Sequence, residues 1–233
     1  MSILILDAET TGLDPKTDKV IEVAVVQYNV DSAYVISSAA NLIRIDGPNT
    51  AERINHIPEG ALKYGVTPET AWSVVKTRSA ICDAVVAHNA AFDRSFLPPE
   101  VLSDKPWICT CHGVQWPLWS PDRKLLSLAA AHGVPIFGSH RALGDCLLLA
   151  SLLTRCKELG HDVEAMLRRV SRPMGKFRAL VSKGRKDEAK AHGFRWDPKE
   201  QIWWKEMAIE DATEEKLGFA VIRLDGAGKE GVQ

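Results

Sequence analysis

Residues 2–15 have the sequence SILILDAETTGLDP, an apolar run that ends in two acidic side chains, Asp7 and Glu9, and then in a turn. The run is typical of a buried β-strand, and the Thr, Gly and Pro that follow are typical of a loop. Residues two apart on a strand point to the same face of the sheet, so the two carboxylates are predicted to lie side by side. An exposed strand end would accommodate the same pair.

Burial makes such a pair costly, because two like charges beside an apolar strand repel each other and lose hydration unless a cation lies between them. Oxygen ligands without Cys or His favour Mg²⁺ or Mn²⁺, ions that keep bound water and share phosphate oxygens of a substrate. The segment therefore predicts a divalent-cation site at the end of the first strand.

The rest of the first 160 residues alternates between strand and helix patterns. Five strands are expected, at 2–7, 20–30, 33–45, 83–89 and 107–111. Helices are expected at 57–65, 67–81, 90–97, 124–133 and 141–160, with Thr67 as an N-terminal cap and with Gly133 and Gly160 as C-terminal stops. This order predicts an α/β fold in which a mixed five-stranded sheet is flanked by helices.

His140 and Asp145 bracket the start of the last of these helices. A carboxylate within LGDCLLLASLL is a candidate metal ligand, with an exposed helical face as the alternative. A histidine beside water activated for attack can accept its proton, with a capping or turn histidine as the alternative.

Composition indicates a globular chain of 233 residues, 45% hydrophobic and 25% charged, with room for one ordinary domain and a smaller one. No apolar stretch approaches the roughly 18 residues that span a bilayer, and the start lacks the basic region of a secretory signal. No membrane contact is therefore expected, and the expected location is cytoplasmic. Five cysteines without regular spacing favour reduced thiols.

Basic residues are concentrated toward the C-terminus. Residues 168–205 contain twelve Lys and Arg against four Asp and Glu, whereas the whole chain has a net charge of −1. This distribution predicts a polyanionic partner, with a solvated charged face as the alternative.

The segments DAETTGLDP, AHNAAFDRSF and HRALGDC resemble the three motifs of the DEDDh, DnaQ-like superfamily of 3′–5′ exonucleases. Within it, WICT, the following LW, HRALGDC and RPMGKF look most like the exodeoxyribonuclease X subfamily. The resemblance covers residues 1–160 and implies a ribonuclease H-like fold. It implies Asp7, Glu9, Asp93 and Asp145 as ligands of two Mg²⁺ or Mn²⁺ ions and His140 as general base. It also implies substrate contacts by Thr10, Leu13, His88 and Asn89. Leu13 could equally be a turn residue that packs inward.

Residues 161–175 are expected to form a helix and a linker, and residues 176–233 a small basic α+β domain. The second segment resembles small domains of unknown function with the pattern KxxAKxxGxxWDxxxxxW, found next to nucleic-acid enzymes. Lys186, Lys190 and Arg195 are candidate nucleic-acid contacts, with Trp196, Trp203 and Trp204 as stacking groups or as core residues.

These features together predict a two-metal 3′–5′ exonuclease that hydrolyses DNA to 5′-mononucleotides, with single strands or duplex 3′ ends as partners. An RNA-trimming enzyme of the same superfamily and a polymerase-associated proofreading exonuclease are the alternatives. A catalytically dead nucleic-acid-binding adaptor is a third hypothesis. Similar nucleases form homodimers, and the sequence leaves that assembly open.

Overall fold

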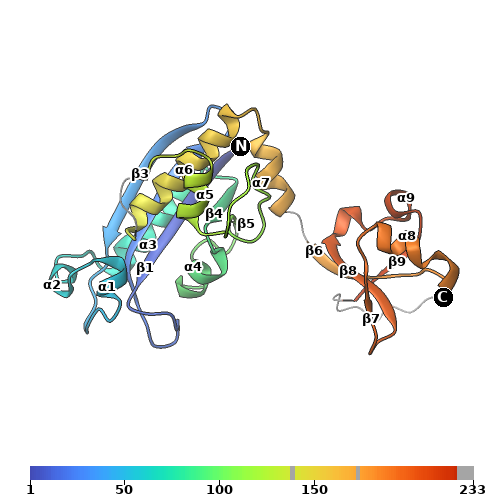
Figure 1. Cartoon of the computed structure of the whole chain (residues 1–233). Helices are drawn as coiled ribbons and strands as arrows, with labels where there is room; N and C mark the ends of the chain where they lie inside the picture. Colours follow the sequence, from blue (N-terminus) through green and yellow to red (C-terminus); the bar gives the residue numbers. More distant parts are fainter. Residues whose placement is uncertain (137–139, 172–173, 225–233) are drawn as a thin grey trace. The chain divides into compact units, whose positions relative to one another are not determined.

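The computed structural model describes residues 1–136, 140–171 and 174–224. They form two compact units, Met1–Ser171 and Arg172–Gln233 (Figure 1). Among these residues, no helix combines the length and the apolar character needed to cross a bilayer.

The first unit is built around a five-stranded sheet with the strand order β3-β2-β1-β4-β5. The long strands β1 (Ser2–Thr10), β2 (Val20–Asn29) and β3 (Tyr34–Leu42) form an antiparallel meander. The short strands β4 (Ala84–Ala87) and β5 (Trp107–Cys109) continue the sheet in parallel on the other side of β1. The predicted mixed five-stranded sheet is confirmed, and β1 lies at its centre.

Helices cover both faces of this sheet, because every second residue of the central strand points to the same side. On one face, Ile3 and Ile5 share a buried core with the apolar stripe of α6 (Ala142–Glu158). On the other face, Leu4 and Leu6 share a core with α3 (Pro68–Ser79). The side chains of odd-numbered β1 residues therefore face α6.

Helix ends follow the predicted chemistry. The Thr67 hydroxyl caps α3 by accepting the Thr70 amide at 3.3 Å, and Gly133 and Gly160 have left-handed backbones at φ 69° and 85° where their helices end. The remaining helices of this unit are α1 (Glu52–Asn55), α2 (Glu59–Leu62), α4 (Ala90–Phe96) and α5 (Leu125–Ala131). Helix α1 was not predicted, because one turn leaves no periodic signal.

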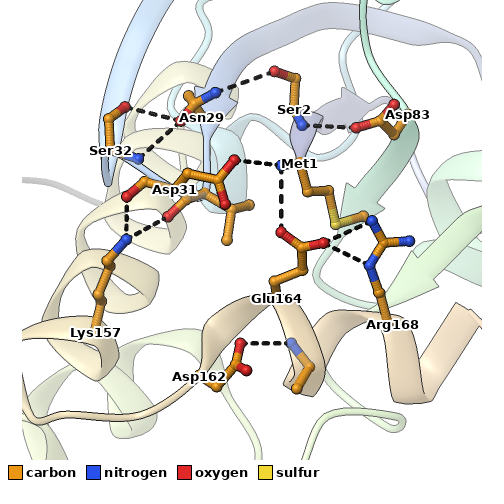
Figure 2. Close-up of polar contacts among 12 residues, drawn as sticks. Met1, Ser2, Asn29, Asp31, Ser32, Asp83, Lys157, Asp162, Glu164 and Arg168 are labelled. Carbon is orange, nitrogen blue, oxygen red and sulfur yellow. Dashed lines mark hydrogen bonds and ion pairs between the residues drawn. The ribbon is translucent and has the colours of Figure 1, made fainter.

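Helix α7 (Val163–Ser171) packs on the first unit. Its Val163 and Leu167 are buried in the same core as Ile3. The Met1 ammonium group donates to Asp31 at 2.7 Å and to Glu164 of α7 at 3.3 Å, as Figure 2 shows. The sequence placed this helix in a connecting segment, whereas its apolar face and the ion pairs tie it to the sheet.

The second unit contains an antiparallel sheet with the order β7-β8-β6-β9, formed by β6 (Met174–Ala179), β7 (Arg195–Asp197), β8 (Ile202–Ala208) and β9 (Val221–Arg223). Its core includes Phe177, Phe194, Met207 and Phe219, and it is covered by α8 (Lys186–Ala191) and α9 (Glu214–Leu217). Two 3-10 turns, Lys183–Arg185 and Ile209–Asp211, precede α8 and follow β8. A small α+β unit was predicted, but α9 and β9 are too short to be recognised in the sequence.

Candidate active site

The period of β1 places Asp7 and Glu9 on the sheet face that α6 covers. Both follow Ile3 and Ile5 at spacings of two, and those residues pack against α6. Because the apolar part of the strand is locked into the core, the two carboxylates cannot turn away from the helix without changing the register of the whole strand.

Asp145 completes a cluster with these two side chains. It lies in the first turn of α6, and one carboxylate oxygen from each of Asp7, Glu9 and Asp145 lies within 4.8 Å of the other two. Three converging carboxylates of intermediate exposure form a hard oxygen site of the kind that holds a divalent cation.

Asp93 reaches the same strand from α4. It is buried, with 2% of its surface exposed, and its carboxylate accepts the Ala8 amide at 3.1 Å. Ala8 lies between the two β1 acids, so Asp93 adjoins the cluster through the backbone. Asp93 is not one of the three residues whose carboxylate oxygens lie within 4.8 Å of one another.

Burial raises the pKa of all four acidic side chains of the site. Burial first, and then the neighbouring carboxylates, raise the pKa of Asp7 well above its usual value. Burial and the charges of Asp145 and Glu22 raise the pKa of Glu9 to about 7, and burial raises that of Asp93 to about 7. Burial also raises the pKa of Asp145, with His140 acting in the opposite direction. A cation between the carboxylates would relieve this repulsion.

Glu22 was missed in the sequence, and it holds the start of α6. It is 3% exposed and lies directly across from Glu9 in the β1–β2 register. Its carboxylate accepts two hydrogen bonds from the Arg141 guanidinium, at 2.6 and 3.0 Å, and one from the Ala142 amide at 3.1 Å. Glu22 therefore takes the place of a local N-cap and fixes the turn that carries His140 and Asp145. A Glu within the apolar strand pattern VIEVAVV was the available signal.

His140 lies at the exposed rim beside the cluster, with a left-handed backbone at φ 62°. It lines a hollow together with Asp145, His88, Asn89 and Arg123. Of the acidic cluster, Asp145 lines this hollow, and the predicted His88 and Asn89 border the same space.

His88 is committed to structural hydrogen bonds. Its two ring nitrogens lie 2.9 Å from the Thr110 hydroxyl and 2.8 Å from the Arg123 carbonyl oxygen, and burial lowers its pKa. The ring therefore braces the wall of the hollow through both of its nitrogens. Asn89, at φ 84°, starts α4.

Thr10 is the last residue of β1, and Leu13 lies on the turn that follows it. Thr10 is 6% exposed, and its hydroxyl donates to the Gly12 carbonyl at 2.5 Å. Leu13 is 82% exposed, so it does not pack inward. The other predicted contacts, Lys186, Lys190 and Arg195, belong to the second unit.

Two family models and several known proteins match this chain. Residues 4–102 match the family described as Exonuclease, and residues 175–224 match a domain of unknown function, DUF8626. The DNA polymerase III subunit epsilon of Treponema pallidum (strain Nichols) is 30% identical over 175 residues, which cover 67% of this chain and 79% of that protein. The PolC-type DNA polymerase III of Thermotoga petrophila is 27% identical over 172 residues, but the chain spans only 12% of it.

Solved structures of exonucleases have a similar fold. Exonuclease X in complex with 5′ overhanging duplex DNA is 27% identical with a TM-score of 0.53, and the match covers 72% of this chain and 99% of that one. The nuclease domain of 3′hExo bound to rAMP shares the fold at 19% identity and a TM-score of 0.55, over 68% of this chain and 92% of that domain. The fold and the acidic cluster define a nuclease of the ribonuclease H-like class. The chain belongs to the DEDDh, DnaQ-like family of exonucleases.

Replacing Arg141 tests the clamp at the start of α6. Arg141→Ala leaves the buried Glu22 carboxylate without its cationic partner, so we expect unfolding in urea to show a loss of about 2 kcal/mol. Arg168→Ala is the control, because its side chain is 60% exposed in a helical i,i+4 ion pair with Glu164, and such pairs contribute only about 0.5 kcal/mol. Equal losses in the two variants would contradict a structural role for the clamp.

The raised pKa values predict how metal and pH interact. Carboxylic acids with a raised folded-state pKa bind more protons when folded than when unfolded, so their contribution is present below about pH 4 and is lost as the pH rises through about 7. We therefore expect Mg²⁺ to raise the melting temperature more at about pH 8 than at about pH 5, because at low pH protons occupy the ligands. Thermal melts at matched ionic strength measure this difference, and a shift independent of pH would contradict it.

Proposed function

We propose that this protein is a metal-dependent 3′–5′ exonuclease that hydrolyses DNA to 5′-mononucleotides. The observation that carries the proposal is the convergence of Asp7, Glu9 and Asp145 within 4.8 Å of one another, beside a hollow that His140 borders. Family membership supports phosphodiester hydrolysis. The similarity to Exonuclease X, described in complex with duplex DNA, supports DNA as the substrate.

In this proposal Asp7, Glu9, Asp93 and Asp145 hold two Mg²⁺ or Mn²⁺ ions. Bound there, such ions would polarise the scissile phosphate and neutralise charge on the leaving oxygen. The donor set fits them, because it consists of carboxylate oxygens alone.

The protein's own groups supply positioning and proton transfer. His140 accepts a proton from the attacking water as its oxygen bonds to phosphorus, and the bond from phosphorus to the 3′ oxygen of the preceding nucleotide breaks. The released nucleotide keeps its 5′ phosphate. The exposed Leu13 on the turn after β1 is available to contact the terminal base, and Asn89 borders the hollow that would receive the 3′ end.

A proofreading role is the second candidate, and one observation favours it: the Treponema relative at 30% identity is a polymerase subunit. In that case the chain would act on mispaired 3′ ends together with a polymerase. An RNA-trimming enzyme would use the same site chemistry. Substrate comparison separates these possibilities from the proposed one.

The first test is release of mononucleotides from 3′-labelled single-stranded DNA, with RNA of the same sequence and a mispaired duplex in parallel. We expect Mg²⁺-dependent release from DNA that EDTA abolishes and that Asp7→Asn lowers by at least about a thousandfold, because removing a metal ligand removes most of the catalysis. Asp104→Asn, an exposed acid in a loop, is the matched control. Activity that survives Asp7→Asn would overturn the proposed metal-dependent mechanism. Faster release from RNA than from DNA would identify RNA as the substrate.

A second variant isolates the proposed general base. His140→Gln should lower kcat by about a hundredfold or more while the melting-temperature shift produced by Mg²⁺ persists, because the carboxylates remain. His161→Gln, an exposed histidine after the far end of α6, should keep full activity. Unchanged kcat in His140→Gln would exclude the role.

A further inference from the structure

The second unit carries an aromatic hollow that the catalytic chemistry does not use. Trp196 on β7 and Trp203 on β8 are direct partners across the antiparallel pair, so their side chains share one face of the sheet. Their ring centroids lie 5.5 Å apart at an interplanar angle of 53°. Trp203 packs partly against the core, whereas Trp196 is 47% exposed. The Trp196 ring therefore packs against the Trp203 ring while it remains open to solvent.

Helix α8 adds positive charge to this hollow. Lys186 and Lys190 are one helical turn apart on α8, and with the two tryptophans they form its lining. The Lys190 ammonium lies 5.8 Å from the centre of the Trp203 ring and 3.3 Å from the exposed carboxylate of Asp187. The buried Ala189 fixes the helix on the core, so the lysines project beside the rings from a fixed backbone.

The other two predicted contacts, Trp204 and Arg195, lie on the opposite face of the same sheet. Trp204 points to that face, where the Lys176 ammonium lies 4.2 Å from its ring centre. Arg195 and Arg178 are the cross-strand partners of Trp204 on either side. Trp204 is thus already covered by a cation, and Arg195 lies away from the hollow.

The chemistry of the hollow selects its ligand. An indole face exposed to solvent takes up a flat, unpaired base, and ammonium groups at the rim neutralise phosphates on either side of it. A duplex hides its base faces and would leave Trp196 unused. No carboxylate is among the four lining residues, and the surrounding segment 168–205 has a large excess of basic residues.

We propose that Trp196, Trp203, Lys186 and Lys190 form a binding site for single-stranded DNA, with one base against Trp196 and the adjacent phosphates on the two lysines. The choice of DNA rests on the proposed function. The site would hold the substrate strand on the chain independently of the metal-dependent site.

Anisotropy of fluorescein-labelled dT15 with the full-length protein in EDTA tests the site without hydrolysis. We expect Trp196→Ala to weaken binding about tenfold and Trp196→Phe to stay within about threefold of the original, because the ring face is retained. Trp204→Ala is the matched control, because it removes a tryptophan from the opposite face. Its affinity for dT15 should stay within about twofold of the original. Lys186→Ala and Lys190→Ala should each reduce the salt dependence of log K by about 0.7.

Several outcomes would overturn the proposal. Unchanged dT15 affinity in Trp196→Ala would do so, and so would a larger loss in Trp204→Ala, which would place binding on the other face. Equal affinity of the original protein for dT15 and a 15-pair duplex would also contradict a stacking site. Hydrolysis of the dinucleotide dTdT in Mg²⁺, measured in parallel, should be the same with and without Trp196→Ala. Failure of all variants to hydrolyse dTdT would count against the proposed function and leave the binding result intact.

Discussion

Mutual repulsion of buried carboxylates is the constraint around which the first unit is organised. Asp7, Glu9 and Asp145 converge, with Asp93 bound to the intervening amide. Bringing such groups together costs free energy, which burial in the core of the sheet and α6 must supply. Burial and neighbouring charge raise the pKa of Glu9 and of Asp93 to about 7. A cation between these carboxylates would offset their repulsion, so cation binding and folding are expected to be coupled.

Glu22, the fifth carboxylate of this region, is neutralised by an ion pair within the protein. Glu22 lies beside the cluster on the same sheet face but is satisfied by Arg141 and the Ala142 amide. Its neighbour Glu9 makes no comparable ion pair among the described residues, although the charge of Arg141 opposes the rise of its pKa. Two glutamates opposite each other in register thus have distinct roles: Glu22 holds the helix start, and Glu9 belongs to the acidic cluster.

The sequence predicted where the acidic side chains of the cluster lie because the signals were local, whereas their catalytic role stays a prediction. The two-residue spacing of Asp7 and Glu9 is sufficient to put them on one face, and Asp145 follows from its place in the first turn of a long amphipathic helix. The pairing of Glu22 with Arg141 joins residues 119 apart, and no local pattern specifies such a contact. The alternation of Trp203 and Trp204 predicted opposite faces, but only the packing of α8 determined which face holds an open ring.

Anomalous diffraction from crystals grown with Mn²⁺ would show whether the three clustered carboxylates bind a cation. We expect a strong anomalous peak within bonding distance of carboxylate oxygens of Asp7, Glu9 and Asp145, with Glu22 still bound to Arg141. A peak elsewhere on the first unit, or Asp7 and Glu9 turned apart with no manganese between them, would contradict it.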